Sequence, residues 1–319
     1  MSVDVLKTLL GKIGGLLLTL FLSSIVIFFA LKLTPGDPVS SIAGGVRPTP
    51  EMAEIIREQY HLNDPIWVQY WSWITNVFSG NLGKSFVYKA DVIDIIAPRF
   101  SVTFMLVSYA LLLIAVFGLG SGILAATRGK RVDRFVLIST SIGMAMPTFV
   151  VAILLIWIFS ITLGLFPVYG AGEGFLDNLY HLTLPAISLA VLFIAYVSRV
   201  SRSALVAQAH SEHVETARVR SIPRGKIFRS HIFLNASPQI MAITGATIAA
   251  LFAVSAITDQ AFGLGGMGSL LTQAASRKDI PVVQVVSLFL VCIFVVMNAL
   301  ADIVTAIIDP ESLKSRRNQ

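Results

Sequence analysis

The chain has 319 residues, of which 55% are hydrophobic and 13% are charged. Its mean hydropathy is +0.79. Because soluble domains are roughly 45–50% apolar and about 25% charged, this composition excludes a disordered chain and disfavours a soluble globular fold. It indicates a membrane protein, whose length is counted in spans of about 20 apolar residues. The single cysteine, Cys292, lies in an apolar run and cannot form an internal disulfide.

Six stretches are long and apolar enough to cross a bilayer as helices, which satisfy their own backbone hydrogen bonds in lipid. They cover approximately residues 11–32, 101–127, 135–166, 182–197, 242–258 and 281–308. The first exceeds the core of a secretory signal, which is about 7–15 residues long, so we expect a retained anchor. The fourth is short, and we place Pro185 in its first turn, where a proline costs the helix little.

The segments between these spans differ in charge. The N-terminus, 128–134, 199–238 and the C-terminal tail together hold 16 Lys and Arg against 6 Asp and Glu, whereas the other side holds 8 against 11. Because cytoplasmic loops carry an excess of Lys and Arg, both termini are predicted to lie in the cytoplasm. This topology also accounts for the net charge of +6, so the basic character does not require binding to nucleic acid. The sequence also lacks a basic patch interleaved with aromatic residues that could stack on bases.

Residues 34–100 are predicted to form an extracytoplasmic segment with short helices. The segment is rich in aromatic residues, namely Tyr60, Trp67, Tyr70, Trp71 and Trp73. A helical pattern covers 51–60 and is opened by Pro48 and Pro50. Amphipathic aromatic helices of this kind rest at the membrane interface or pack as a cap, and both interpretations stay open.

The segment 199–238 predicts a helical hairpin on the cytoplasmic side. Ser211 is expected to cap a helix whose first turns are acidic. That helix should stop near Ser221, because Ile222-Pro223 disfavours its continuation and Gly225 loosens the backbone. A second helix then resumes and leads into the fifth span.

An ordinary solvated basic loop is the alternative interpretation of this segment. The hairpin has an apolar side, however, which water would not favour. That side is formed by Val214, Ala217, Val219, Ile222, Ile227 and Phe228. A rigid projection with both apolar and charged residues is suited to docking in a groove of another protein.

The string Glu215-Thr216-Ala217-Arg218 resembles the EAA loop of ABC importer permeases, in which Glu-(Ala/Thr)-Ala is followed, after three residues, by Gly. The wider chain resembles the permeases of dipeptide, oligopeptide and nickel importers. The matching landmarks include 35–38 (Pro-Gly-Asp-Pro), 80–85 (Gly-Asn-Leu-Gly-Lys-Ser), 147–149 (Pro-Thr-Phe), 167–170 (Pro-Val-Tyr-Gly), 184–186 (Leu-Pro-Ala), 263–265 (Gly-Leu-Gly) and 309–310 (Asp-Pro). In two departures, Ser221 stands where the pattern has Gly, and Pro238 lies one residue early. A positive φ at Ser221 would cost about 1 kcal/mol.

The resemblance implies an all-α membrane protein with six transmembrane helices of the type I ABC importer permease fold. Its parts would be the N-terminus with the first transmembrane helix (1–33), the extracytoplasmic segment (34–100), the core permease domain (101–308) and a cytoplasmic tail (309–319). The resemblance places the protein in a bacterial or archaeal cytoplasmic membrane. It implies no catalysis and no cofactor in this chain, because ATP and Mg are bound by partner ATPase subunits.

The implied partners are a second homologous permease subunit, two cytoplasmic ATPase subunits, an extracytoplasmic substrate-binding protein and membrane lipid. By resemblance, the residues that couple to the ATPase are Glu215, Thr216, Ala217, Arg218, Arg220, Ser221 and Gly225. We expect Glu215 to pair with a basic residue of the ATPase, Ala217 to permit its close approach, and the two arginines to make rim contacts. The candidate residues that face the binding protein are Glu51, Glu54, Glu58 and Trp67.

Peptides are the expected substrate, and nickel or another metal chelate is the alternative. A more distant alternative is an ion-coupled secondary transporter, which needs charges near the membrane midplane that the second and third spans lack.

The acid inside a span, Asp302, is expected to join helices. The Gly-rich run 262–269 lacks the lysine of a P-loop and is interpreted as a bend. His210, Glu212 and His213 lack the spacing of a zinc site.

Overall fold

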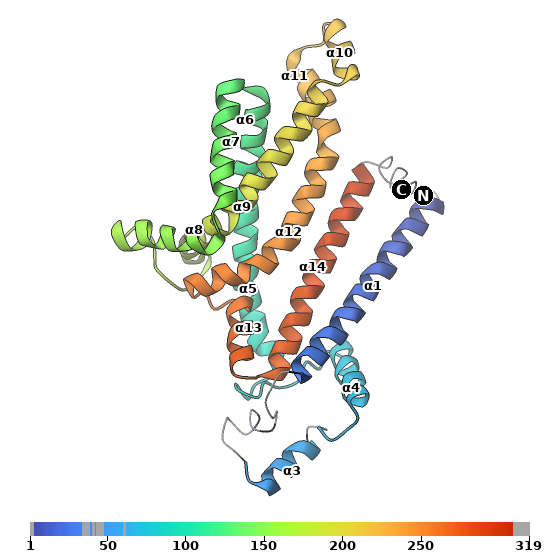
Figure 1. Cartoon of the computed structure of the whole chain (residues 1–319), viewed down its shortest axis with the longest axis vertical. Coiled ribbons are helices and arrows are strands. Elements are labelled where there is room, and N and C mark those ends of the chain that lie inside the picture. Colours follow the sequence, from blue (N-terminus) through green and yellow to red (C-terminus); the bar gives the residue numbers. More distant parts are fainter. Residues whose placement is uncertain (1–2, 34–38, 40–41, 43–47, 60–61, 309–319) are drawn as a thin grey trace. The chain divides into compact units, whose positions relative to one another are not determined.

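The computed structural model describes residues 3–33, 39, 42, 48–59 and 62–308, and its side chains from residue 14 onward except those of 302 and 304–308. This part of the chain is almost entirely helical (Figure 1). The helices are α1 (Val3–Lys32), α3 (Pro50–Gln59), α4 (Ile66–Phe78), α5 (Val92–Leu113), α6 (Gly120–Thr127), α7 (Lys130–Ala145), α8 (Thr148–Leu155), α9 (Phe175–Ala209), α10 (Glu212–Val219), α11 (Arg224–Ile227), α12 (Leu234–Phe262), α13 (Met267–Ser276) and α14 (Ile280–Ile308). Wider π-type turns continue three of them, namely η1 (Ile114–Leu119) after α5, η2 (Ile156–Thr162) after α8 and η3 (Phe228–Phe233) after α11.

The chain divides into two compact units. One contains residues 1–103 and 265–295, and the other contains residues 104–264 and 296–319. The first unit therefore holds α1, α3, α4, α13 and most of α14, and the second holds α6 to α12. The predicted cytoplasmic hairpin lies wholly in the second unit, and the predicted extracytoplasmic segment lies wholly in the first.

Within the described residues, five helical stretches are long and apolar enough to cross a membrane. They are Gly14–Lys32, Val92–Thr127, Phe175–Ala209, Arg224–Phe262 and Ile280–Ala301. The pair α7 and α8 makes a sixth if its two helices are counted together. The predicted all-α architecture is confirmed. Each predicted span overlaps one of these stretches or the α7–α8 pair, although the bounds differ and several of the helices extend well beyond the apolar stretches that predicted them.

The third predicted span, 135–166, is wrong as a single straight helix. The helices α7 and α8 are bent by 99° where they meet, and α8 turns away from α7 in Figure 1. The break lies at Met146 and Pro147, whose backbones are extended, with ψ of 120° and 142°. A proline lacks the backbone N–H of the helical ladder and disfavours a helical conformation at the residue before it, so the helix ends there.

The fourth predicted span, 182–197, is too short at both ends. The observed helix α9 runs from Phe175 to Ala209, and Pro185 lies well inside it rather than in its first turn. Pro185 is buried, as are many α9 residues around it. Proline is tolerated inside membrane helices because neighbouring groups compensate for the missing hydrogen bond. Packing around α9 therefore outweighs the local preference that suggested a helix start.

Two glycines bring the run from η1 to α6 close to α9. A Cβ atom on Gly122 would lie 2.7 Å from the carbonyl oxygen of Ser198 and 2.9 Å from Cβ of Ser201. A Cβ atom on Gly118, one turn earlier, would lie 3.3 Å from Cβ of Val197. Small residues spaced four apart allow helix backbones to approach closely in lipid. This contact positions α9, which carries the hairpin at its C-terminal end.

In the first unit, α4 packs against α1 through aromatic side chains. The Tyr70 ring lies 5.4 Å from the Phe28 ring, and its hydroxyl is 2.8 Å from Oγ of Ser24. Nζ of Lys32 donates a hydrogen bond to Oε1 of Gln69 at 2.5 Å. Trp67, in contrast, is 64% exposed. Part of the aromatic segment thus packs as a cap on α1, while other aromatic side chains stay on the surface.

The close approach at Gly122 generates a prediction about stability. We expect Gly122→Ala to lower the thermal unfolding midpoint of the detergent-solubilised chain, because the added methyl group meets a backbone carbonyl that cannot yield easily. Overpacking of this kind costs about 1–3 kcal/mol. The matched control is Gly120→Ala in the same helix, where the added Cβ enters open space and alanine favours the helix. Equal midpoints for the two variants would show that the helices are not tightly packed at Gly122.

Candidate functional site

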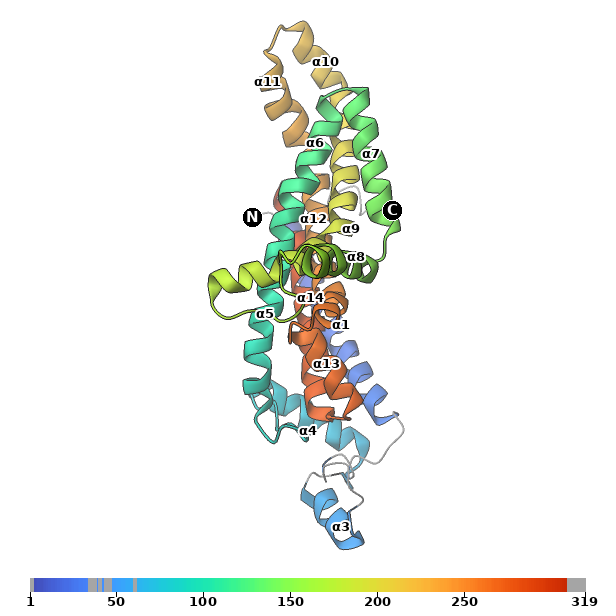
Figure 2. The same cartoon turned by 90° about the vertical axis from the view of Figure 1, so that its left-hand side faces the viewer.

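The predicted cytoplasmic hairpin is present in the structure. It consists of α10, a turn, α11 and η3, which leads directly into α12. Figure 2 shows α10 and α11 projecting beyond the adjacent ends of α6 and α7. The hairpin is joined to α9 on one side and to α12 on the other, and these two helices pack together through Ala204, Leu205, Ala236 and Ile240.

The hairpin has its own small hydrophobic core. Val214, Ala217 and Ile227 are buried, with exposed fractions of 0%, 3% and 5%, and they pack with the partly buried Ile222 and Ile232. Ala217 is therefore buried within the hairpin, and its expected role in the close approach of the ATPase stays a prediction. Its small size lets α10 lie close to α11 within the hairpin. Val219, which was expected on the same apolar side, is 85% exposed.

The turn after α10 explains why the chain reverses at Ser221. The N–H of Ser221 donates to the carbonyl of Arg218 at 3.0 Å, and the N–H of Ile222 donates to that of Ala217 at 3.2 Å. These two bonds define a Schellman motif, in which the first residue beyond the helix cap adopts a left-handed conformation. Ser221 does so, with a φ of +56°. The conformational strain considered for this serine is thus present.

Two details of the predicted turn differ from the structure. Gly225 lies inside α11 and is not among the residues with a positive φ, so the backbone freedom of glycine is not used there. Ser211 occupies the N-cap position of α10 but makes no capping hydrogen bond. Its Oγ instead donates to the carbonyl of Gln208 at 2.6 Å, at the end of α9. This bond joins the hairpin to α9 rather than satisfying the first turn of α10.

Polar contacts also fix the hairpin to its base. Nη2 of Arg218 donates to the carbonyl of Ala209, the last residue of α9, at 3.1 Å. Nε2 of His213 lies 3.1 Å from the carbonyl oxygen of His231 and 3.2 Å from Nδ2 of Asn235. His213 therefore links α10 to the second arm of the hairpin.

Among the described residues, no group of three or more His, Cys, Asp or Glu side chains could hold a metal ion.

The remaining predicted coupling residues lie on the outside of the hairpin. Glu215, Thr216, Arg218, Arg220 and Ser221 are all exposed. Oγ1 of Thr216 donates to the carbonyl of Glu212 at 3.0 Å, so its hydroxyl is engaged within α10. The hairpin thus presents acidic, basic and apolar side chains together on a folded support.

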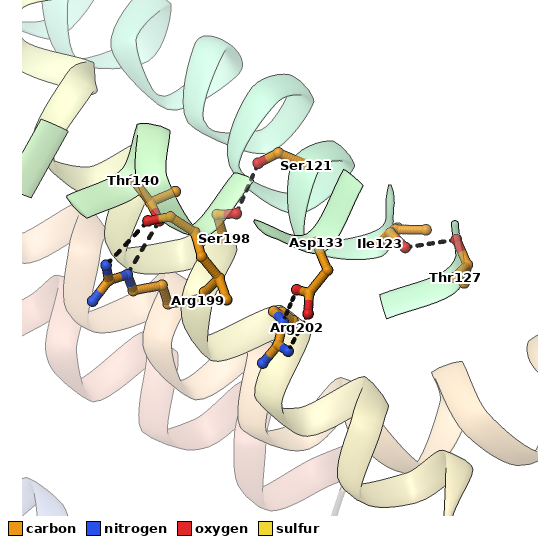
Figure 3. Close-up of polar contacts among 9 residues, drawn as sticks. Ser121, Ile123, Thr127, Asp133, Thr140, Ser198, Arg199 and Arg202 are labelled. Atoms are coloured by element: carbon orange, nitrogen blue, oxygen red, sulfur yellow. Dashed lines mark hydrogen bonds and ion pairs between the residues drawn. The ribbon is translucent and has the colours of Figure 1, made fainter. Parts of the chain in front are cut away.

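Below the hairpin, two arginines attach α9 to α7 (Figure 3). Arg202 forms a two-bond ion pair with Asp133, in which Nη2 and Oδ2 are 2.7 Å apart. Nε of Arg199 donates to Oγ1 of Thr140 at 3.1 Å. The pair between Arg202 and Asp133 joins a planar guanidinium group to a carboxylate through two bonds, which fixes the orientation of the two side chains as well as adding stability. These contacts hold the end of α9 in place where the hairpin begins.

In the first unit, α3 carries three of the residues predicted to face a binding protein. Glu51, Glu54 and Glu58 are exposed, while Ile56 on the same helix is buried with Val39, Ile42 and Phe86. Glu54 is also engaged within the chain, because it lies 3.5 Å from Arg57 and accepts a hydrogen bond from Asn63. Glu51, Glu58 and the exposed Trp67 of α4 are not brought into one cluster by any described contact.

Sequence reasoning missed the buried acid that anchors this segment. Asp279 is fully buried at the start of α14 and accepts hydrogen bonds from Oγ of Ser85 and from the backbone N–H groups of Phe86 and Val87, the latter two at 2.9 and 3.3 Å. Oγ of Ser85 in turn accepts the N–H of Tyr88 at 2.8 Å. The landmark 80–85 pointed to this place in the chain but did not identify its partner.

Some predicted features lie outside the described residues. These are the landmarks 35–38 and 309–310, the aromatic residue Tyr60 and the side chain of Asp302. The Gly-rich run 262–269 is described, and it is a bend as predicted. Gly263 ends α12 with a φ of +57°, and Gly265 has a φ of +71°.

Long apolar helices, with a folded hairpin between two of them, define a helical membrane protein. Residues 118–314 match the family described as binding-protein-dependent transport system inner membrane component, and residues 5–107 match the N-terminal family of the same membrane components. The chain belongs to this family, the permeases of ABC importers. It is therefore a multi-pass inner-membrane transport subunit that works with a substrate-binding protein and with ATPase subunits.

Curated relatives and solved structures agree with this assignment. A Brucella abortus (strain 2308) protein, provisionally named a peptide transport system permease, is 35% identical over 307 residues, which cover 95% of this chain and 97% of the relative. The glutathione transport system permease protein of Escherichia coli (strain K12) is 30% identical over 306 residues, covering 96% and 98%. An inward-facing structure of the MetNI methionine ABC transporter has a TM-score of 0.53 at 17% identity and covers 68% of this chain and 97% of that chain. The last likeness confirms the type I permease fold.

The left-handed serine in the hairpin turn generates a second prediction. We expect Ser221→Gly to slow amide hydrogen exchange in α10, because glycine adopts a positive φ without the penalty of about 1 kcal/mol that other residues carry. The matched control is Ser230→Gly in η3, where the backbone is helical and glycine should speed local exchange instead. If both substitutions speed exchange, the turn at Ser221 is not strained.

Proposed function

We propose that this chain is the permease subunit of an ATP-driven peptide importer, and that its hairpin docks on a cytoplasmic ATPase subunit. The observation that carries the proposal is that the hairpin has its own apolar core while its outer face remains exposed. Val214, Ala217 and Ile227 stabilise it from within, and Glu215 and Arg220 remain on its surface. The peptide substrate is supported by the names of relatives that match almost the whole chain.

The hairpin is suited to transmitting movement into the membrane. It is bonded to the end of α9 through Arg218, and its second arm continues without interruption into α12. A force on the hairpin therefore acts on two packed membrane helices at once. A flexible loop would absorb this movement, whereas a body with its own core passes it on.

The assembly we propose contains this chain together with its partner subunits and a binding protein. The spans of this chain form half of a translocation pathway, which a second homologous permease subunit completes. Two ATPase subunits on the inside bind ATP and Mg, a binding protein on the outside delivers substrate, and this chain itself holds no cofactor and catalyses no reaction. Both termini face the cytoplasm, as the excess of Lys and Arg on that side predicts.

The coupling role is tested in the assembled importer by reversing charges on the outside of the hairpin. We expect Glu215→Lys combined with Arg220→Glu to lower peptide-stimulated ATP hydrolysis and peptide uptake by at least about tenfold, since charge reversal at an interface costs roughly several kcal/mol. Ala217 is not altered, because a polar side chain there would disrupt the core of the hairpin.

The control for this test is Glu212→Lys, which reverses one charge on an exposed side chain of the same helix. It should leave stimulated hydrolysis close to that of the unaltered chain. Intact coupling in the double variant would contradict the docking role.

Parallel uptake assays with labelled tripeptides, glutathione and nickel chelates identify the substrate class. Transport of nickel chelates alone would replace peptide as the proposed substrate.

We also propose that α3 contributes to the docking of the binding protein. The support is its exposed acidic face, set on a helix whose other side is anchored by Ile56. The role of α4 is different, because its buried Tyr70 and Ile74 attach it to α1.

The α3 proposal is tested by Glu51→Lys combined with Glu58→Lys, which avoids Glu54 because of its internal contacts. We expect the concentration of binding protein that gives half-maximal ATPase stimulation to rise at least about fivefold, with the maximal rate unchanged, because rim charges act mainly on association. Gln59→Lys, on the same helix, should have a smaller effect. An unchanged half-maximal concentration would favour a purely structural cap.

A further inference from the structure

The helix α4 carries no charged residue, although it belongs to the segment between the first two spans. The sequence from 65 to 83 contains no Asp, Glu, Lys or Arg. The neighbouring helix α3, in contrast, has four charged residues among its ten. Three tryptophans and a tyrosine lie in α4, and these two residue types are enriched where a membrane meets water. The composition of α4 therefore differs from that of a helix surrounded by water.

The apolar side chains of α4 gather on one side of the helix. Because a helix repeats every 3.6 residues, Trp67, Trp71 and Phe78 project from the same side. Ser72 and Asn76 project from the opposite side by the same spacing. A helix divided in this way into an apolar side and a polar side is typical of helices that lie in the surface of a membrane.

Contacts with α1 cover only part of this apolar side. Tyr70 is buried and packs against Phe28 of α1 (Figure 1). Trp67, Trp71 and Phe78 are 64%, 57% and 86% exposed. We call these three residues the aromatic strip of α4. A contiguous apolar surface of this kind marks a contact with another apolar phase or with another protein.

The contacts of α4 place the aromatic strip beside the last turns of a membrane span. The span of α1 ends at Lys32, whose Nζ donates to Oε1 of Gln69 on α4. Tyr70 contacts α1 at Phe28 and Ser24, which lie about 6 and 12 Å from Lys32 along the helix, at 1.5 Å per residue. Helices in a membrane surface bury their apolar side by about 5–10 Å. The side of α4 next to Tyr70 therefore reaches the depth of acyl chains.

A cavity of about 270 Å³ borders the C-terminal end of α4. Its walls come from α1, α4 and α14, and all of its lining residues belong to the first compact unit. They include Phe21, Phe78 and Leu288. Ser24 also lines the cavity, but its hydroxyl is already bonded to that of Tyr70. The end of α4 thus borders the apolar surfaces of two spans.

The absence of charge on α4 indicates which part of the membrane it contacts. The aromatic strip has no Lys or Arg that could bind a phosphate group, and no acid that could repel one. Its chemistry matches the acyl chains and the glycerol region, which all phospholipids share. The indole N–H groups of the two tryptophans can donate to the ester oxygens at this boundary.

We propose that α4 lies in the outer leaflet of the membrane, with its aromatic strip among the acyl chains and with Ser72 and Asn76 turned toward water. The excess of Lys and Arg on the other side of the membrane assigns this leaflet to the outside. Gln69 also donates to the carbonyls of Leu62 and Asp64, so this contact anchors the chain between α3 and α4 near the membrane. The proposal concerns neither the ATPase nor the transported substrate.

The proposal is tested with spin labels on the full chain in vesicles of dioleoyl-phosphatidylcholine. Cys292→Ala removes the single cysteine, and Trp71→Cys, Phe78→Cys or Asn76→Cys then provides one site for the label. Oxygen dissolves among acyl chains, whereas a polar nickel chelate stays in water, because moving polar groups into an apolar phase is unfavourable. We expect relaxation by nickel to be lost at 71 and 78, where relaxation by oxygen persists, and to be retained at 76.

Two other positions calibrate the measurement. Val26→Cys places a label on an exposed side chain within the span of α1, and Glu58→Cys places one on the exposed side of α3. Labels at 71 and 78 should behave like the label at 26. If they behave like the label at 58, the aromatic strip lies in water and the proposal is wrong. Thermal unfolding of each variant shows whether it is folded, and Trp67→Cys takes the place of one that is not.

The same labels distinguish lipid from a protein partner. Weak relaxation by both oxygen and nickel at 71 and 78 would show that protein covers the aromatic strip, as a second copy of this chain could, and would overturn the proposal. The measurement is repeated in the assembled importer. Persistent relaxation by oxygen supports contact with lipid, whereas its loss on assembly would assign the strip to the second permease subunit. Uptake and ATP hydrolysis test the proposed function separately.

Discussion

The packing of α9 against its neighbours is the constraint on which the second unit depends. Gly118 and Gly122 allow η1 and α6 to approach α9 so closely that a methyl group at Gly122 would meet its backbone. On another side, Arg199 and Arg202 attach α9 to α7 through hydrogen bonds and an ion pair. These contacts fix the helix from which the hairpin projects. The hairpin can act as a defined element only because its support is held in this way.

The same principle applies inside the hairpin, at a smaller scale. A short helix of eight residues, α10, is marginal by itself in water. It is held by the apolar contacts of Val214 and Ala217, by a Schellman turn and by side-chain bonds to α9 and to η3. Small residues therefore serve contact within the chain at Ala217, as they do at Gly122. The outer charges are left available for another molecule.

Much of this arrangement could be predicted from the sequence, because membrane spans and charge bias are properties of composition. The all-α fold, the approximate spans and the position of the hairpin are of this kind, and the resemblance of Glu215-Thr216-Ala217-Arg218 to the EAA loop identified the family. The positive φ at Ser221 could also be anticipated, since the motif has glycine there. Which side chains of a short helix are buried was harder to predict. Ala217 and Val219 were both expected on the apolar side of the hairpin, yet Ala217 is buried and Val219 is exposed.

The features that the sequence did not predict depend on contacts between distant residues. The bend at Pro147 could be suspected from local rules, yet Pro185 obeys the same rules and lies inside a continuous helix. Only the surroundings of the two prolines distinguish them. The bond between Ser85 and Asp279 joins residues separated by 194 positions, and no local pattern indicates such a pair.

This last bond has a consequence for biosynthesis. The segment at 85–87 obtains its buried acceptor only when residue 279 has been made, because Asp279 supplies the carboxyl group that binds Ser85, Phe86 and Val87. At about 5–20 residues per second, the ribosome needs roughly 10–40 s to cover the intervening 194 positions. During that interval the donors at 85–87 must be satisfied by water or by other proteins. The bonds at 85–87 therefore form only after most of the chain has been synthesised.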